Sequence, residues 1–221
     1  MRSTLTMLGI TIGVASITTI LALSAGAGKI VSDQVDALGG NIAVIRPGTQ
    51  AEVGLQNVSQ LPITQHFAAS TLTENDLTTI QAVEHVKSLA PLMVLSGAVK
   101  ASSSAPMSTS ILATTPELAT ISGLKIQDGT FLDPNLSPYT AIIGPQLSIN
   151  VYGTEQSIGK TITIRGQAFT IIGILKRDNT PINYNGVDFD NSAIIGREAG
   201  RALNNGALQI QQINVQSDSV S

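Results

Sequence analysis

A run of 23 apolar and small residues near the N-terminus constrains this chain more than any other feature. No side chain from residue 4 to residue 28 is charged, and the run at residues 5–27 lies between Arg2 and Lys29. About 20 apolar residues in a helix span the hydrocarbon of a bilayer. The hydroxyl groups within this run are tolerable there because serine and threonine can bond to the carbonyls of their own helix. We therefore predict a transmembrane helix over residues 1–28.

The residue pattern of this segment predicts packing against other helices. At about 100° per residue, Ile10, Val14, Ile17 and Leu21 form one stripe of large aliphatic side chains. Much of the remaining circumference is small, and a GxxxG pair allows another helix backbone to approach closely. The predicted helix-packing residues are Gly9, Gly13, Ala15, Thr18 and Ala22.

The helical period continues beyond the apolar run. Apolar residues recur at helical spacing up to residue 38, with polar and charged residues between them, and a Gly-Gly pair then ends the pattern as a C-cap does. We predict a rigid stalk over residues 29–40, with a cytoplasmic N-terminus indicated by Arg2. The predicted stalk-coupling residues are Val31, Val35, Leu38, Gly39 and Gly40. A helix over residues 4–38 would be about 50 Å long, against ~30 Å of hydrocarbon.

The same segment also fits a cleaved signal peptide, in which residues 25–27 would be the A-x-A cleavage site. Two features count against this alternative. The apolar run is longer than the 7–15 residues typical of a signal peptide, and the helical period passes through the supposed cleavage site. Both interpretations remain open at this point.

Composition excludes several classes of function. Twelve basic against fifteen acidic residues give a net charge of −3, which leaves no basic excess for nucleic acid binding. There is no cysteine, so disulfides, thiolate catalysis and cysteine-bound zinc are excluded. The two histidines, His66 and His85, are far apart and have no visible partner for catalysis. We therefore predict no catalytic residues, no cofactor and no metal.

After the stalk, the sequence alternates between helical and strand patterns. Short β-branched or alternating runs predict strands, and Arg165-Gly166 predicts a hairpin turn between two of them. A capping-box pattern at residues 73–76 predicts the start of a helix, and residues 49–70 predict a long loop. The fold class is therefore α+β with a mixed sheet. The predicted strands are 41–46, 86–100, 107–115, 141–143, 161–164, 168–175, 193–195 and 210–216, and the short helices 116–121 and 197–203.

Two patterns resemble catalytic or binding motifs but do not meet their requirements. Residues 153–161 (GTEQSIGKT) are one residue too long for a P-loop, and they lead into a strand where a P-loop must open a helix. Asp188 and Asp190 would share a face of a strand, yet no further metal ligands lie nearby in the sequence. We predict a structural loop in the first case and a solvated loop in the second.

Several segments resemble the MacB/FtsX-type ABC transporter permeases. The start of the apolar helix is similar to the first transmembrane helix of that family, and the resemblance extends over essentially the whole chain. The segments that carry it are RSTLTMLGITIGVA at 2–15, QVDALGGNIAVIRPG at 34–48, LTENDLTTI at 72–80, GTF at 129–131 and IGKTITIRGQAFTIIGIL at 158–175.

The resemblance implies a fold in which the helix is followed by a porter-like lobe that carries an inserted, mostly-β, sabre-like lobe. On this basis we expect the first lobe over residues 41–135, the inserted lobe over 136–205, and a return strand within 206–221. It also implies a permease with four transmembrane helices, so that this chain, which stops before the second, is expected to be a fragment.

The implied function is that of a non-catalytic permease subunit of an export or extraction system, which passes ATPase-driven movement to an extracytoplasmic domain. The expected partners are an ABC ATPase subunit or domain, a second permease copy, membrane lipid, and a periplasmic adaptor or outer-membrane channel. The expected location is the inner membrane, with the main domain outside the cytoplasm. Two alternatives remain, namely an FtsX-like module that regulates cell-wall hydrolases and a secreted binding domain.

Overall fold

The computed structural model describes residues 2–37, 41–47, 71–101, 105–177 and 185–218, and it consists of two compact units. The first unit is Met1–Gly40 and the second is Asn41–Ser221. The loop predicted over residues 49–70 lies outside the described residues.

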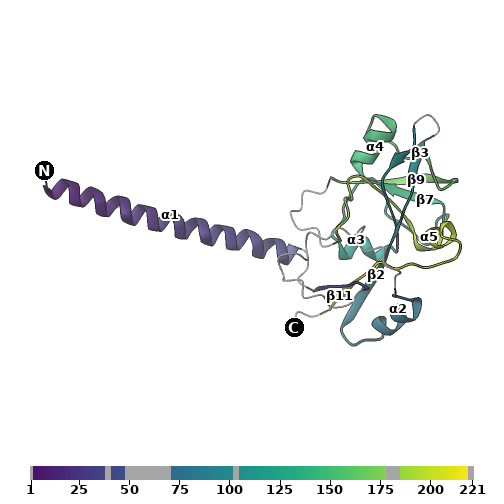
Figure 1. The fold of residues 1–221 in the computed structure, drawn as a ribbon, viewed down its shortest axis with the longest axis horizontal. Helices are drawn as coiled ribbons and strands as arrows, with labels where there is room; N and C mark the ends of the chain where they lie inside the picture. The colour runs from purple at the N-terminus through teal and green to yellow at the C-terminus, as the bar shows by residue number, and fades with distance from the viewer. Residues whose placement is uncertain (1, 38–40, 48–70, 102–104, 178–184, 219–221) are drawn as a thin grey trace. The chain divides into compact units, whose positions relative to one another are not determined.

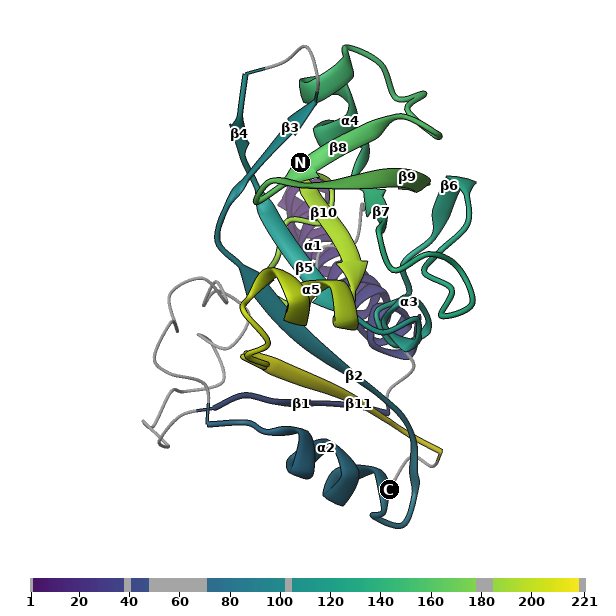
Figure 2. The same ribbon diagram turned by 90° about the vertical axis from the view of Figure 1, so that its right-hand side faces the viewer.

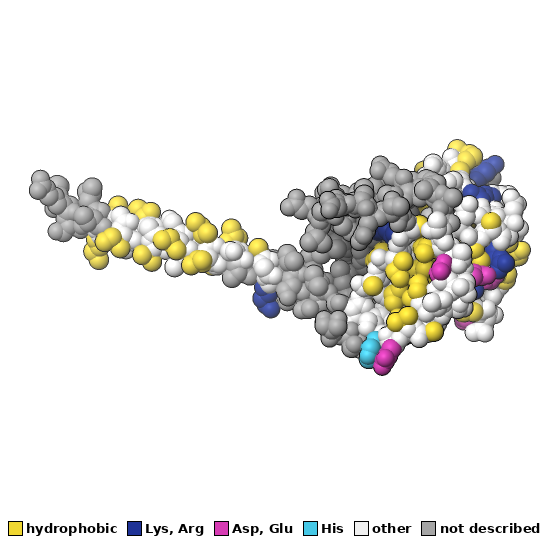
Figure 3. All heavy atoms as spheres, turned by 60° about the horizontal axis from the view of Figure 1, so that its bottom comes forward, with side chains coloured by type: hydrophobic (Ala, Val, Ile, Leu, Met, Phe, Trp, Pro, Cys, Tyr) yellow, Lys and Arg dark blue, Asp and Glu magenta, His cyan; other side chains and the backbone are white. Residues whose placement is uncertain are grey.

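The first unit is one long helix, α1 (Arg2–Ala37). It continues through residues 25–32 without a break, as the helical period of the sequence predicts. Its apolar side chains are spread over the visible side of the helix in Figure 3.

The second unit is built on a mixed sheet of paired strands, which confirms the predicted fold class (Figure 1). In the described residues the strand order is β1-β11-β2-β5-β10-β7-β9-β8-β3-β4, and β6 pairs with β9 beside this path. The strands are β1 (Ile42–Ile45), β2 (Val86–Leu95), β3 (Ala98–Ala101), β4 (Met107–Ser108), β5 (Ser110–Thr114), β6 (Ile126–Gly129), β7 (Thr140–Ile143), β8 (Thr161–Ile164), β9 (Gln167–Leu175), β10 (Ser192–Gly196) and β11 (Gln212–Ser217). The helices are α2 (Glu74–Gln81), α3 (Glu117–Ile121), α4 (Pro145–Tyr152) and α5 (Arg197–Leu203).

Hydrophobic side chains form two clusters, one on each face of the sheet. Alternation along β5 places Ile111 and Ala113 in one cluster and Leu112 in the other. Helix α3 contributes Leu118 to the second cluster, whereas α5 contributes Ala199 to the first. The core is aliphatic because the sequence contains only 3% aromatic residues.

Strand β2 connects the β1–β11 pair to the other strands of the sheet. Its first part pairs with β11 and its last residues pair with β5 (Figure 2). At the change of partner, the Thr114 hydroxyl donates to the Pro91 carbonyl at 2.8 Å. The Gln211 side-chain oxygen accepts from the backbone N–H of Val94 at 2.8 Å. These two side chains supply hydrogen bonds where the strand ladder is interrupted, since buried backbone groups need partners.

Several predicted elements are observed with small differences. The hairpin turn at Arg165-Gly166 connects β8 and β9, and a capping box at Thr73 and Asp76 starts α2. The strand predicted over residues 86–100 divides into β2 and β3. Strand β6 and helix α4 were not predicted from the sequence.

The predicted division of the second unit into two lobes remains a prediction. Strands β3 and β4 lie before residue 136, yet β3 pairs with β8, which belongs to the predicted inserted lobe. Strand pairing therefore crosses the predicted boundary.

Candidate functional site

Helix α1 contains a segment that is long and apolar enough to cross a membrane. This segment is Met7–Lys29, 23 residues long, and none of it is buried inside the protein. Its nine large hydrophobic side chains are each 56–74% exposed. A helix that exposes so much apolar surface on all sides needs an apolar solvent or protein partners to cover it.

Four hydroxyl groups of this segment form hydrogen bonds within the helix. Thr11 donates to the Met7 carbonyl at 3.0 Å, and Ser16 donates to the Ile12 carbonyl at 2.8 Å. Thr18 and Thr19 make the same kind of bond to residues four positions earlier. In hydrocarbon, where no water is available, these internal bonds remove the main cost of the polar groups. The prediction that serine and threonine bond to carbonyls of their own helix is thus confirmed for these four residues.

The five residues predicted to pack against other helices fall into two groups. At about 100° per residue, Ala15, Thr18 and Ala22 lie within ~60° of one another, whereas Gly9 and Gly13 lie on the opposite side. Large side chains separate the two groups on both flanks. A Cβ atom added at Gly9 or Gly13 would meet nothing within 4 Å. Helix α1 therefore has two opposite small faces, and their packing role stays a prediction.

The predicted stalk-coupling residues lie only partly within the described structure. Val31 and Val35 belong to α1, which ends at Ala37. Leu38, Gly39 and Gly40 lie outside the described residues, so the predicted joint at the two glycines stays a prediction.

The second unit begins and ends at neighbouring positions. Strand β1 pairs antiparallel with β11, and the backbone N–H of Ser217 donates to the Asn41 carbonyl at 2.8 Å. Among the described strands, β11 is the one that pairs with β1. Among the described strands, β1 is therefore hydrogen-bonded to the sheet through β11, which in turn pairs with β2.

Buried polar side chains lie along β11 at this junction. The Gln212 amide nitrogen donates to the side-chain oxygen of Asn185 at 2.9 Å, and Asn214 donates to the same oxygen at 2.7 Å. The Nε of Arg46 donates to the Gln212 side-chain oxygen at 2.9 Å. Burial lowers the pKa of the Arg46 guanidinium below its ordinary value. These bonds tie the end of β1 to β11 and to the segment around Asn185.

Sequence reasoning missed this network. In β11, Gln212 and Asn214 alternate with Ile213 and Val215, a pattern that normally marks the exposed face of a strand. In the structure, both polar residues are fully buried. Hydrogen-bond partners that are distant in the sequence, Arg46 after β1 and Asn185, help to make that burial possible.

The two motifs rejected from the sequence have structural roles. Helix α4 ends at Gly153 in a left-handed C-cap, and Thr161 starts β8, so the segment between them opens no helix. The Lys160 ammonium lies 4.6 Å from the centre of the Tyr152 ring. The Asp188 carboxylate accepts from the backbone N–H groups of Asp190 and Asn191. Among the described residues, no group of three or more His, Cys, Asp or Glu side chains is placed to hold a metal ion.

Known proteins resemble this chain over most of its length. The family model of MacB-like periplasmic core domains matches residues 3–220. The macrolide export ATP-binding/permease protein MacB of Wolinella succinogenes is 27% identical, over 100% of this chain and 32% of its own length. The protein of that name from Neisseria gonorrhoeae is 29% identical, over 80% of this chain and 26% of its own length. The chain thus spans about a third or less of these curated relatives.

Two solved structures share the fold. The periplasmic region of MacB from Actinobacillus actinomycetemcomitans superposes with a TM-score of 0.66 at 18% identity, covering 85% of this chain and 79% of that one. The extracellular domain of the noncanonic ABC-type transporter YknZ from Gram-positive bacteria gives 0.59 at 19% identity, covering 81% and 84%. At these identities the likeness concerns the fold alone.

Proposed function

Because the chain belongs to the family of MacB-like periplasmic core domains, we propose that it is a non-catalytic permease segment of an ABC-type export or extraction system. In this role it transmits ATPase-driven movement across the membrane to an extracytoplasmic domain. The observation that carries the proposal is the unbroken helix α1, whose 36 residues exceed the length of its apolar segment. At about 1.5 Å per residue, such a helix is longer than ~30 Å of hydrocarbon and leaves several turns outside it.

The order of the elements along the chain supports this transmission of movement. A continuous helix is stiff along its axis, so a shift at one end moves the other end as a rigid body. Strand β1 follows α1 in the chain and is hydrogen-bonded to β11. The Arg46–Gln212 bond adds a side-chain link between the residue that follows β1 and β11. We propose that residues 29–40 act as the coupling element and that the β1–β11 pair receives the movement.

The partners in this proposal follow from the apolar surface and from the names of the relatives. Lipid covers the segment Met7–Lys29, and a second permease copy packs against it. ATP is hydrolysed on a separate ABC ATPase domain or subunit, and the relatives are named ATP-binding/permease proteins. A periplasmic adaptor or outer-membrane channel is a further partner. The proposed location is the inner membrane, with Asn41–Ser221 outside the cytoplasm.

An insertion series in the complete transporter tests the coupling proposal. Two extra residues after Ser32 rotate everything beyond them by about 200°, whereas seven extra residues add close to two full turns and restore the phase. We expect the two-residue insertion to lower transport and partner-stimulated ATP hydrolysis at least tenfold, and the seven-residue insertion to retain most of both. A two-residue insertion at the exposed turn of Asn205 and Gly206 serves as the control. Full activity of the two-residue stalk variant would contradict the proposal.

One measurement separates this function from the secreted alternative. An apolar helix near the N-terminus satisfies the criteria for a membrane span and for a signal sequence alike. The intact mass of the protein recovered from membranes shows whether residues 1–27 are retained. Loss of these residues would remove the proposed carrier of movement and leave a secreted domain.

A further inference from the structure

A row of side-chain hydrogen bonds crosses the second unit from the end of β1 to helix α3. Arg46, the residue after β1, donates to Gln212 of β11, and Gln212 donates to Asn185. The Nδ2 of Asn185 in turn donates to the Ser122 hydroxyl oxygen at 3.2 Å. Ser122 is the C-cap of α3, and its backbone N–H donates to the Leu118 carbonyl of that helix at 2.8 Å. The row therefore links β1, β11 and α3, which are distant from one another in the sequence.

Asn185 is the centre of this row. Its side-chain oxygen accepts from Gln212 and from Asn214, at 2.9 and 2.7 Å, while its side-chain nitrogen donates to Ser122. Asn185 is 2% exposed, and the two β11 side chains are fully buried. The β2 residues opposite these two belong to the second hydrophobic cluster, to which α3 also contributes. The amide network thus lies on the face of the sheet that α3 covers.

Strand β11 faces α3 with these amides and not with apolar side chains. Its buried apolar residues, Ile213 and Val215, belong to the first cluster, on the other face of the sheet. In the part of the chain that the structure describes, β11 contributes no apolar side chain to the second cluster. The position of β11 relative to α3 on this face is therefore set by directional hydrogen bonds.

Hydrogen bonds in this position fix geometry more than they add stability. Replacing both partners of a buried hydrogen bond by apolar groups of similar shape is often nearly neutral, whereas leaving one partner unpaired is costly. The bonds from β11 to Asn185 measure 2.7 and 2.9 Å. Since such a bond is lost beyond about 3.5 Å, a displacement of β11 against Asn185 by about 1 Å breaks both. Apolar contacts are non-directional and tolerate such sliding.

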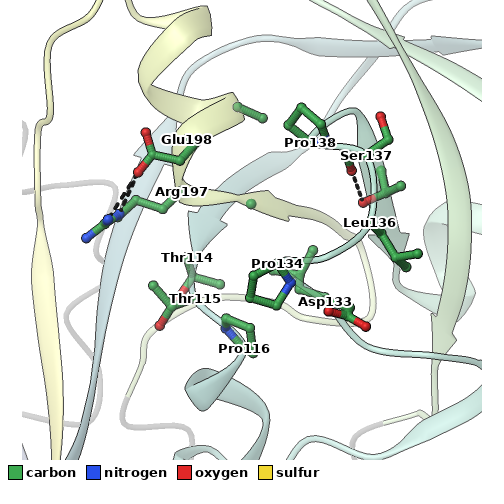
Figure 4. Close-up of a pocket in the computed structure, with 14 residues that line it drawn as sticks. Thr114, Thr115, Pro116, Asp133, Pro134, Leu136, Ser137, Pro138, Arg197 and Glu198 are labelled. Carbon is green, nitrogen blue, oxygen red and sulfur yellow. Dashed lines mark hydrogen bonds and ion pairs between the residues drawn. The ribbon is translucent and has the colours of Figure 1, made fainter.

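Helix α3 connects the row with the end of β5. It follows β5 in the chain, and its N-cap Pro116 lines a hollow of about 270 Å³. Figure 4 shows Pro116 on one side of this hollow and Pro138, from the loop before β7, on another. A shift of α3 therefore changes the shape of the hollow.

We propose that Asn185 is a positioning residue that makes β11 and α3 move together, so that a displacement of β1 reaches α3. The inference rests on the proposed function, because the displacement of β1 originates in the stalk. Backbone pairing passes the displacement from β1 to β11, and the amide network passes it from β11 to α3. Hydrogen-bond networks with discrete arrangements are one physical means of such coupling.

Fluorescent labels at two positions of the complete transporter test the inference. Ala43 of β1 and Thr120 of α3 are both exposed, and this chain contains no cysteine. Ala43→Cys and Thr120→Cys therefore each provide a single site within the chain for an environment-sensitive fluorophore. We expect ATP to change the fluorescence at both positions in the parent protein, because β1 and α3 are displaced together.

The decisive variant replaces the amides by apolar side chains. Asn185→Leu, Gln212→Met and Asn214→Leu together leave none of these three amides unpaired. We expect the ATP response at Thr120 to fall at least threefold, while the response at Ala43 and the rate of ATP hydrolysis are retained. A merely structural defect would instead diminish the responses at both positions.

Two single variants complete the test. Ser122→Ala removes only the last bond of the row, at a partly buried position, and we expect it to lower the response at Thr120 at least twofold. Ser88→Ala is the matched control, because it removes a 3.2 Å bond to Gln216 of the same strand β11 and leaves Asn185 untouched. It should retain both responses.

The outcomes separate this inference from the proposed function. A response at Thr120 that stays unchanged in the triple variant, or in Ser122→Ala where the triple variant does not fold, would overturn the inference and leave the proposed function standing. Absence of any ATP response at Ala43 in the parent transporter would overturn the proposed function, and the inference with it.

Discussion

At the scale of single residues, Arg165 holds three parts of the second unit together. Its Nε and Nη2 donate to the Ser96 carbonyl at 2.9 and 2.6 Å, and its Nη1 donates to the Leu203 carbonyl at 3.1 Å. The residue lies at the tip of the β8–β9 hairpin with a positive φ of 49°. The hairpin turn was predicted from the local sequence, but these contacts join residues up to 69 positions apart and have no local signal.

Replacement of Arg165 by alanine should therefore lower stability. We expect the free energy of unfolding to fall by about 1–2 kcal/mol, since two carbonyls lose their charged donor. Arg165→Lys should recover only part of this loss because an ammonium lacks the planar fork of donors. Chemical unfolding of the full chain in detergent measures the effect. The control is Arg177→Ala, which removes solvent-accessible ion pairs of 3.6 and 3.8 Å to Asp190 and Glu155 and should change stability less. Equal losses in both alanine variants would contradict the expectation.

The capping box of α2 predicts a dependence of stability on pH. Hydrogen bonds from the Thr73 backbone and hydroxyl to Asp76, at 2.7 and 2.8 Å, lower the pKa of this carboxyl below its ordinary value of 3.8. A lowered pKa in the folded state stabilises the protein above the unfolded pKa, and this contribution is lost as the pH falls through the folded pKa. We expect Asp76→Asn to be less stable than the parent at pH 7 and to approach it as the pH falls below 3.8 and through the lowered folded pKa. Unfolding midpoints measured from pH 7 downwards provide the measurement, and a difference in stability that stays constant with pH would contradict this role of the capping box.

At the scale of elements, prediction succeeded where the signal was local and failed where it came from tertiary pairing. The capping box, the hairpin turn and the apolar run each lie within a short segment, and each is observed. Strand β6 exists because it pairs with β9, and its residues Ile126–Gly129 show no clear strand pattern. Helix α4 had a usable signal, with proline at its first turn and Gly153 after its end, which are typical helix boundaries.

The packing of α4 depends on a close backbone approach at Gly144. A Cβ atom at this position would lie 2.1 Å from the Asp190 carbonyl oxygen and 2.2 Å from that of Phe189. The same Asp190 carbonyl accepts from the backbone N–H groups of Gln146 and Leu147 at the start of α4. A methyl group would therefore force apart the helix and the segment that satisfies its first N–H groups.

We expect Gly144→Ala to lower the free energy of unfolding by about 2–3 kcal/mol, as overpacking of a rigid backbone contact does. The matched control is Gly196→Ala. Gly196 is also an N-cap glycine with an extended backbone, but nothing lies within 4 Å of its Cβ position. Its replacement should cost below about 1 kcal/mol. Unfolding of both variants under identical conditions gives the comparison. Similar losses of stability in the two variants would contradict a special role for the close backbone contact at Gly144.

At the scale of the whole molecule, each unit has a distinct physical requirement. Helix α1 exposes apolar side chains, and four hydroxyls of its apolar segment bond to carbonyls of the same helix, which suits hydrocarbon. The second unit has an aliphatic core and starts and ends at the paired strands β1 and β11. The return strand expected within residues 206–221 corresponds to β11, but its exact partners, β1 and β2, had no local signal because they are distant from it in the sequence.

The two small faces of α1 lead to a prediction about assembly. Leucine in place of Gly13 or Thr18 preserves the apolar character of the segment but fills one face or the other. Helices associate in membranes through close contact of small residues, so a bulky side chain separates them. We expect both Gly13→Leu and Thr18→Leu to reduce assembly of the complete permease in detergent, measured by size-exclusion chromatography and crosslinking. Ile17→Leu, on the bulky stripe between the faces, is the matched control and should assemble normally.

The pattern of the results distinguishes the possible arrangements of α1. Loss of assembly in both variants requires helices on both sides, because the two positions lie roughly 140° apart around the helix axis. Loss with only Gly13→Leu would place the single contact on the glycine face, and loss with only Thr18→Leu would place it on the face of Ala15, Thr18 and Ala22. Normal assembly of both would mean that lipid covers the whole circumference, and the predicted packing residues would then have no role in assembly.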